Sequence, residues 1–177
     1  MAGFSLVELM VALAIFAIMA SVAIPSFANM VRDNRLASSV NELHAALVLA
    51  RSEAIRSRTR VTACTSPDGA QCASQAGWHT GWILFADDNG NARVDAGEKV
   101  MRRGEAMAEG VVAVGNATLV DYVSYAPAGS TRAVGGALQM GTIRACSGES
   151  QRAIVISASG RARVVRSAQC ELGGEQG

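Results

Sequence analysis

Two arginines near the C-terminus are the residues of this sequence best suited to binding a ligand. Arg161 and Arg163 follow Gly160 in the order Gly-Arg-Ala-Arg. In an extended chain, residues two positions apart point to the same face and lie about 7 Å from each other. Guanidinium groups at that spacing can hold successive phosphates of a DNA strand through paired hydrogen bonds. The stretch therefore predicts a contact with DNA phosphates. The alternative is an exposed edge hairpin whose charges are only solvated.

Further arginines could support such a contact. The chain from residue 132 onward holds six arginines and three glutamates, a local charge of +3 in a chain whose net charge is +1. The candidate supports within this group are Arg166, Arg152 and Arg144. Arginine binds phosphate in a bidentate way, but a GC-rich genome also favours arginine, and Lys99 is the only lysine. The hypothesis therefore depends on the positions of the arginines and not on their number.

A second group of residues has the spacing of a calcium-binding loop. The template takes its ligands from positions 1, 3, 5, 7, 9 and 12, which here are Asp87, Asn89, Asn91, Arg93, Asp95 and Glu98. Position 6 is Ala92 where the template has glycine, and the flanking residues have the pattern of strands instead of helices. Hairpin loops use Asp, Asn and Gly to bond their own backbone. We therefore expect a structural loop and no metal site.

A third candidate is a single carboxylate in an apolar segment. Glu8 is the only charged residue among the 21 residues from Phe4 to Ile24. As a helix this segment spans about 30 Å, the thickness of the hydrocarbon core of a membrane. A carboxylate there costs about 2.5–3.5 kcal/mol, so it calls for a functional reason. The alternative is an ordinary signal peptide or a single membrane anchor in which the lone Glu has no role, but no A-x-A cleavage site follows a short apolar region.

The cysteines indicate an oxidising compartment. Cys64, Cys72, Cys146 and Cys170 all lie outside the apolar segment. An exported domain with an even number of cysteines is expected to form disulfides, and four cysteines allow three connectivities. The spacing favours the local pairs Cys64–Cys72 and Cys146–Cys170. No CxxC motif is present, so neither zinc nor a redox site is expected.

A long helix and a set of strands must position these residues. Between residues 26 and 58, apolar residues recur four and three apart alternately, which predicts a helix with one apolar stripe: Leu36, Val40, Leu43, Leu47, Ala50 and Ala54. Pro25 should bend this helix or unwind it locally. Strands are expected at 59–64, 82–85, 99–103, 111–114, 120–125, 137–144, 152–157 and 161–166. This order predicts an α+β fold with the helix packed on antiparallel sheets.

The first residues resemble a known family. Gly3-Phe4-Ser5-Leu6-Val7-Glu8 and the apolar run resemble the class III leader and N-terminal segment of type IV pilins and pseudopilins. The resemblance implies cleavage between Gly3 and Phe4 by a prepilin peptidase, and N-methylation of Phe4. It also implies that Glu8 attracts the amino terminus of a neighbouring subunit during assembly. The leader Met1-Ala2-Gly3 is very short and lacks Lys or Arg, a departure from the family.

The middle of the chain narrows the resemblance. Its segments resemble the GspH/FimT/FimU branch of minor pilins and pseudopilins at Cys64-Thr-Ser-Pro-Asp-Gly-Ala-Gln-Cys72, Trp78-His-Thr-Gly-Trp82 and Asp95-Ala-Gly97-Glu98. We expect both tryptophans to pack in the core. The implied organisation is a leader remnant at 1–3, a transmembrane and assembly helix at 4–25, an amphipathic helix at 26–58 and a β-rich periplasmic domain at 59–177.

The resemblance leaves two functions open. Gly160-Arg161-Ala162-Arg163 resembles the GRxR motif of FimT-like members, which implies DNA binding without sequence specificity for natural transformation. The alternative is a FimU- or GspH-like structural subunit of a pilus or of a type II secretion pseudopilus, without DNA binding. Either way the implied partners are other major and minor pilins, prepilin peptidase and the inner membrane, and the final location is a cell-surface pilus. No cofactor is expected, and no residues form a catalytic set, which argues against an enzyme.

Overall fold

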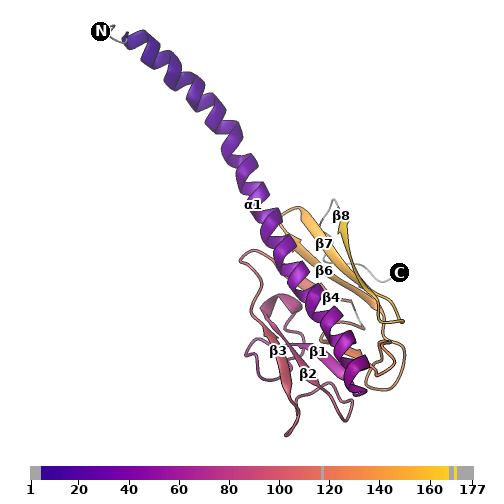
Figure 1. Cartoon of the computed structure of the whole chain (residues 1–177). Helices are drawn as coiled ribbons and strands as arrows, with labels where there is room; N and C mark the ends of the chain where they lie inside the picture. Colours follow the sequence, from indigo (N-terminus) through magenta and orange to yellow (C-terminus); the bar gives the residue numbers. More distant parts are fainter. Residues whose placement is uncertain (1–4, 117, 168–169, 171–177) are drawn as a thin grey trace. The chain divides into compact units, whose positions relative to one another are not determined.

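The described residues form one long helix followed by two antiparallel sheets. The computed structural model describes residues 5–116, 118–167 and 170. Its elements are α1 (Leu6–Ser57), β1 (Val61–Thr65), η1 (Trp78–Thr80), β2 (Trp82–Ala86), β3 (Val100–Gly104), β4 (Val112–Gly115), β5 (Tyr122–Tyr125), β6 (Gly141–Ser147), β7 (Ser150–Ile156) and β8 (Ala162–Ser167) (Figure 1). This confirms the expected α+β, pilin-like fold. The expected cleavage site between Gly3 and Phe4 lies outside the described residues.

Helix α1 runs through two compact units of the chain, residues 1–34 and 35–177. In the first unit many large apolar side chains are exposed, among them Leu6, Phe16 and Met30. By length and composition, α1 is apolar enough to cross a membrane. The helix continues through Pro25, so local unwinding there is not observed. Proline removes one backbone hydrogen bond, and the bonds of the neighbouring turns are enough to keep the helix formed.

In the second unit, the buried face of α1 is the stripe expected from the sequence. All six of its residues are at most 1 % exposed, which confirms that prediction: Leu36, Val40, Leu43, Leu47, Ala50 and Ala54. They share one core with residues of both sheets, such as Val61 and Val123 in one and Ile143 and Ile154 in the other. Each large side chain in such a core contributes about 1.5–3 kcal/mol relative to exposure. Both sheets are therefore held against the same helix (Figure 1).

The two sheets differ in what covers their outer faces. Sheet A has the strand order β3-β2-β1-β5, and sheet B has the order β4-β6-β7-β8. The outer face of sheet A carries a second small core around Cys64, Ile83 and Phe85, which the neighbouring loops cover. Sheet B ends in the edge strand β8, whose side chains are alternately half-buried and exposed over its first residues. Arg163 therefore lies on an accessible edge strand, and Arg161 comes just before that strand.

The disulfides join the pairs that the spacing favours. Cys64 is bonded to Cys72 with a Cα–Cα distance of 5.6 Å. Cys146 on β6 is bonded to Cys170, which follows β8, with a Cα–Cα distance of 5.7 Å. The second bond links the chain after the edge strand to a strand inside the sheet. In the chain-entropy model, a loop of this size adds about 3 kcal/mol of stability.

Most strands lie within a few residues of their expected positions, with one clear difference. The strand expected at 137–144 begins at Gly141 and continues to Ser147. Residues before it turn back across the end of β5, where Gln139 accepts a hydrogen bond from the Ser124 amide at 3.0 Å. Its side-chain amide also donates to the Tyr122 carbonyl at 2.9 Å. The side chain of Gln139 thus forms hydrogen bonds with the backbone of β5, in place of the backbone-to-backbone bonds that a strand would form in this segment.

Candidate nucleic-acid interface

The turn between β7 and β8 places the two candidate arginines at one end of sheet B. Within the turn, the Gly160 amide donates to the Ser157 carbonyl at 2.8 Å, and the Ser157 amide donates to the Arg161 carbonyl at 3.1 Å. Gly160 has a φ of +80°, and a Cβ atom there would lie 1.9 Å from the Gly129 carbonyl oxygen. Glycine is therefore required by both conformation and space. The amide of Gly160 is used inside the turn, so the role of this residue is to shape the turn.

Replacing Gly160 with alanine should destabilise the domain strongly. The left-handed conformation costs a non-glycine residue about 1–2 kcal/mol, and the close Gly129 carbonyl adds a backbone clash. We expect the free energy of unfolding to fall by about 3 kcal/mol or more. The matched control is Gly148→Ala, because Gly148 has a φ of +59° but no atom within 4 Å of an added Cβ. If chemical denaturation showed the same loss of unfolding free energy for both variants, the clash with the Gly129 carbonyl would have no effect on stability.

The register of sheet B divides the candidate arginines between its two faces. Arg163 pairs with Val155, and Arg144 pairs with Ala153, which in turn pairs with Val165. By the alternation of side chains along strands, Arg163 and Arg144 share the outer face. Arg163 is exposed and Arg144 is partly buried. Arg161 is also exposed and lies just before β8, at the end of the sheet.

Arg152 and Arg166 lie on the opposite face, and this corrects the expected set of supports. They pair with each other across β7 and β8. Arg152 has the same strand parity as Ile154, which packs in the core under α1, and is itself only 6 % exposed. A phosphate on the outer face therefore cannot reach it. Arg166 is exposed but faces the helix side of the sheet, because β8 alternates in step with β7.

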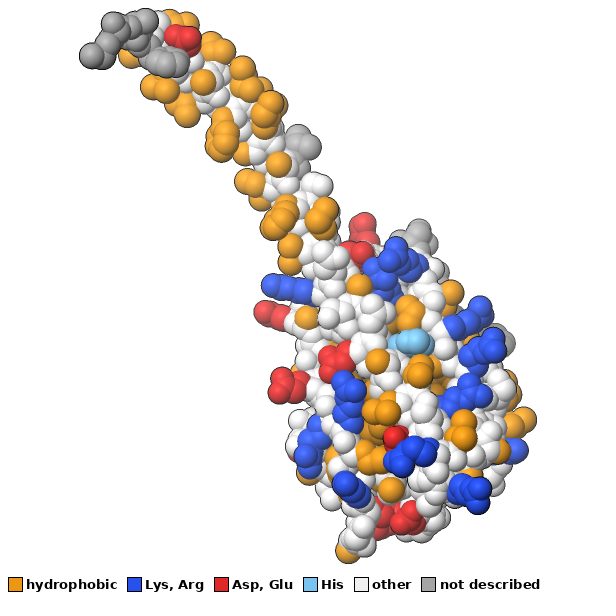
Figure 2. Space-filling model, in the orientation of Figure 1, with side chains coloured by type: hydrophobic (Ala, Val, Ile, Leu, Met, Phe, Trp, Pro, Cys, Tyr) orange, Lys and Arg blue, Asp and Glu red, His pale blue; other side chains and the backbone are white. Residues whose placement is uncertain are grey.

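The exposed arginines of this region are not neutralised by nearby acids. Within residues 5–116, 118–167 and 170, Arg56 forms a salt bridge with Glu53 on α1, and no salt bridge involves Arg161 or Arg163. Arg161 and Arg163 thus have no carboxylate partner in that part of the chain. Figure 2 shows basic side chains gathered along the edge of the domain where Figure 1 places β7 and β8. This edge can attract a polyanion even though the net charge of the chain is only +1.

Two residues of α1 hold the turn, and sequence reasoning gave neither a role in the site. The Arg51 guanidinium donates from Nη2 to the Ser159 carbonyl at 3.0 Å. The Nε2 atom of His44 lies 3.2 Å from the Ala162 carbonyl. The two residues are seven apart, which places them two turns apart on one face of the helix. That spacing is the signal that could have paired them, but only the fold shows which turn they reach.

Arg51 also lies close to the buried ring of Tyr125. Burial raises the pKa of the Tyr125 hydroxyl well above its ordinary value, and the positive charge of Arg51 offsets part of that rise. A Cβ atom at Gly129 or at Gly160 would lie 3.3 or 3.4 Å from the Arg51 Nε atom. Two glycines therefore leave the room that the guanidinium occupies. The arginine is held in place by its surroundings instead of moving freely in solvent.

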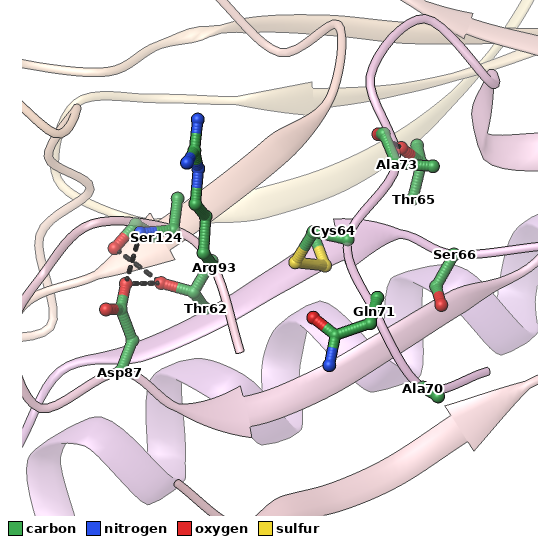
Figure 3. The surroundings of a disulfide bond; sticks show 12 residues. Thr62, Cys64, Thr65, Ser66, Ala70, Gln71, Ala73, Asp87, Arg93 and Ser124 are labelled. Carbon is green, nitrogen blue, oxygen red and sulfur yellow. Dashed lines mark hydrogen bonds between the residues drawn. A yellow bond between two sulfur atoms is a disulfide. The ribbon is translucent and has the colours of Figure 1, made fainter. Parts of the chain in front are cut away.

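The candidate calcium loop uses its oxygens for its own backbone. Buried Asp87 accepts a hydrogen bond from Thr62 Oγ1 at 2.6 Å (Figure 3). It also accepts hydrogen bonds from the backbone amides of Asn91 at 3.0 Å and Ala92 at 3.2 Å. The Glu98 carboxylate accepts from the amides of Asp88 and Asp95, each at 2.9 Å. Within the described ranges, no three acidic, His or Cys side chains are grouped to hold a metal. The geometry is that of a structural loop.

Asp95 completes this loop through side-chain bonds. Its Oδ2 atom accepts hydrogen bonds from the amide groups of Asn89 at 2.7 Å and Asn91 at 2.6 Å. These bonds lower the pKa of Asp95 below its ordinary value, with Asn89 as the larger cause. The ionised carboxylate therefore accepts both side-chain bonds within the loop.

Calcium should leave the stability of the protein unchanged. An ion that bound only the folded chain would raise the melting temperature by mass action. Because the oxygens of Asp87 and Glu98 already accept amide hydrogen bonds, we expect the same melting temperature with calcium and with a chelator. Differential scanning fluorimetry over a calcium titration measures this, and a saturable rise would make the loop a metal site.

The comparison with known families identifies the chain. The family model described as type II transport protein GspH matches residues 39–160. The chain belongs to the GspH family. A second model, the prokaryotic N-terminal methylation motif, matches residues 1–24 of this GspH-family protein. It is therefore a minor pilin or pseudopilin, and proteins of this family are structural and not enzymes.

Solved structures support the fold of this GspH-family protein. It is similar to the type IV minor pilin FimU of Pseudomonas aeruginosa PAO1, with a TM-score of 0.59 and 21 % identity over 78 % of this chain and 97 % of that one. A second crystal form of FimU gives a TM-score of 0.55 and 20 % identity over 76 % and 98 %. No curated protein matches the chain. At these identities the likeness describes the fold alone.

The family match stops just before the candidate arginines. It ends at Gly160, so Arg161 and Arg163 lie beyond it. Membership of the GspH family therefore neither assigns nor excludes a role for these two residues.

Proposed function

We propose that this protein is a minor filament subunit that assembles through the N-terminal segment of α1. The observation that carries the proposal is Glu8, an exposed carboxylate in the first turn of an otherwise apolar, exposed helix segment. Such a charge is stable in an apolar setting only with a partner of opposite sign. Cleavage between Gly3 and Phe4 by a prepilin peptidase would supply that partner as the methylated amine of a neighbouring subunit.

In this proposal the protein first resides in the inner membrane, with residues 4–25 in the bilayer. The domain, with its disulfides at Cys64–Cys72 and Cys146–Cys170, is exposed on the periplasmic side, where disulfides persist. Other major and minor pilins then take it into a type IV pilus or a type II secretion pseudopilus. The deciding measurement is the amount of the protein in purified filaments when Glu8 is replaced.

We propose DNA binding at the outer face of sheet B as a second function, which would serve natural transformation. The observation that favours it is the pair of exposed guanidinium groups, Arg161 and Arg163, on and beside an edge strand without carboxylate partners in the described chain. Arg144 shares the outer face and can support the contact. Guanidinium groups bind phosphate oxygens in a bidentate manner, which favours contacts to the DNA backbone.

The chemistry of this strand predicts binding that is weak and indifferent to sequence. No aromatic residue lies between Gly160 and Arg166, so bases have no side chain on which to stack. Contacts to phosphates position a protein on DNA but do not read its sequence. Several subunits or neighbouring pilins on one DNA strand would raise the overall affinity by linkage. Affinity measured on duplexes of different sequence, over a range of salt concentrations, tests this function.

A further inference from the structure

A groove runs between α1 and the turn that carries the arginines. It has a volume of about 370 Å³ and is lined by Val48, Arg51, Ser52, Ile55, Gly160, Arg161 and Ala162. Val48 and Ile55 are large apolar side chains that remain 46 % and 50 % exposed. The lining therefore combines an apolar floor with two guanidinium groups and a hydroxyl, and contains no acid. Its chemistry suits an anion that carries an apolar or sugar-like group.

We propose that this groove holds one phosphodiester of a bound DNA strand between Arg51 and Arg161, with the adjoining deoxyribose against Val48 and Ile55. This rests on the proposed DNA-binding function and extends it to a residue of α1. Arg161 lines the groove and also belongs, with Arg163, to the β7–β8 hairpin, which we call the arginine hairpin. The groove and the surface of this hairpin are therefore continuous. A strand that crosses the outer face of β8 can therefore continue into the groove at the end of the sheet.

Arg51 is prepared for this role by its contacts with the protein. Its Nη2 group donates to the Ser159 carbonyl, and Gly129 and Gly160 leave space beside its Nε atom. Its Nε atom is buried without an acceptor in the described part of the chain, so the proposed phosphate contact is made by the outer end of the guanidinium, and no carboxylate pairs with the side chain. A guanidinium that is already oriented loses less side-chain entropy when it binds a phosphate.

The occupant is inferred from charge. With two cations and no acid in the lining, an anion is favoured over a cation or a neutral apolar peptide. The other candidate anion is a carboxylate on a neighbouring pilin, which the experiment below distinguishes from DNA. DNA is favoured because the groove continues the arginine surface, on which phosphates recur at regular intervals.

The test adds a negative charge to the floor of the groove without changing any arginine. We expect Ile55→Glu to weaken the binding of a labelled DNA duplex by about tenfold or more at low salt, through repulsion of the phosphate. Ile55→Gln has nearly the same size and removes the apolar contact without adding a charge, so it should weaken binding much less than Ile55→Glu, and the difference between the two variants measures the effect of the charge. Ser38→Glu makes a similar charge change at an exposed position of α1 outside the groove and should also bind like the parent. Fluorescence anisotropy on the full chain in a non-ionic detergent gives the affinities.

Two further variants keep the test decisive. Ser52→Glu places the same charge at an exposed groove residue, should Ile55→Glu unfold the domain. Arg51→Gln should lower the slope of log affinity against log salt by about 0.9, the value for one phosphate contact on duplex DNA, and Arg51→Lys should restore part of that slope. A groove that only positions the turn would not distinguish Ile55→Glu from Ile55→Gln.

The outcomes separate this inference from the function on which it rests. If the parent binds DNA and both Ile55 variants bind equally well, the groove is not a DNA site while the arginine hairpin remains one. If the parent fails to bind DNA at low salt, the DNA-binding function is wrong and the groove proposal fails with it. If the Ile55 variants lower incorporation into filaments and leave DNA affinity unchanged, the groove takes a neighbouring subunit instead.

Discussion

Replacing Arg161 and Arg163 together with alanine should abolish detectable DNA binding and DNA uptake while the domain stays folded. Both side chains are exposed, and neither forms a salt bridge in the described chain. Exposed substitutions of this kind usually change stability by less than about 0.5 kcal/mol. Each phosphate contact removed should also reduce the salt dependence, by about 0.9 in log-log slope on duplex DNA. Because the parent has few such contacts, losing two should leave only the weak long-range attraction between DNA and the remaining basic residues.

The matched control for this experiment is the pair Arg93→Ala and Arg102→Ala. Both residues are exposed and belong to the sheet A side of the domain, Arg102 on β3 and Arg93 in the loop after β2. The two double variants have the same net charge, so any difference in affinity reports position and not total charge. Lysine at 161 and 163 should retain part of the binding, because the charge remains although the bidentate geometry is lost.

This experiment has two outcomes that would contradict the proposal. Binding equal to that of the parent in a folded Arg161→Ala, Arg163→Ala variant would place the DNA site elsewhere on the protein. Equal losses in the control variant would mean that overall charge, and not the hairpin, attracts DNA. Circular dichroism and the melting temperature establish that each variant is folded before its affinity is compared.

Replacing Glu8 with alanine should leave the protein in the membrane and processed, but nearly absent from filaments. Removing the carboxylate makes the helix segment more apolar, so membrane insertion should not suffer. The loss falls on assembly, because removing one partner of a buried ion pair costs about 3–5 kcal/mol. We therefore expect incorporation to fall by more than about tenfold, since each 1.4 kcal/mol changes an equilibrium tenfold.

Immunoblots of membrane and sheared filament fractions measure the amount of processed protein in the membrane and the amount in filaments. Glu8→Gln should behave like Glu8→Ala, since it keeps the size of the side chain and removes only its charge. Glu42→Ala is the matched control, because Glu42 is an exposed carboxylate on α1 outside the apolar segment. Normal incorporation of Glu8→Ala would contradict the assembly role, and equal loss in Glu42→Ala would show that the effect is not specific to the apolar segment.

The sequence was sufficient to predict the long helix of this fold and the approximate positions of its strands. The apolar stripe of α1 from Leu36 to Ala54 is buried as its periodicity predicted. Trp78 and Trp82 lie in the core, as expected for large aromatic residues. These features depend on local periodicity and on the cost of exposing apolar surface, which can be read along the chain. The short helix η1 at Trp78–Thr80 was missed, because a single turn has no periodicity to detect.

The sequence also indicated where the candidate site lies, but not which of the arginines belong to it. It singled out Gly160, Arg161 and Arg163, and the structure supplies a reason for the glycine, which lies against the Gly129 carbonyl. It named Arg152 as a possible support for the DNA contact, although Arg152 is buried on the helix side of sheet B. Strand parity sets the face, and parity requires the register of β7 and β8, which no local pattern reveals.

Contacts between distant segments were decided by the tertiary structure alone. Arg51 reaches Ser159 across 108 positions of sequence, and the groove beside it exists only because α1 and the β7–β8 turn meet. In the sequence, Arg51 is one of several polar residues that lie off the apolar stripe. Local preference determines which segments become helix or strand, whereas long-range packing determines which side chains meet. The local sequence pattern therefore indicates some of the residues that can bind a ligand. The shape of the site is determined only by the packing of distant segments.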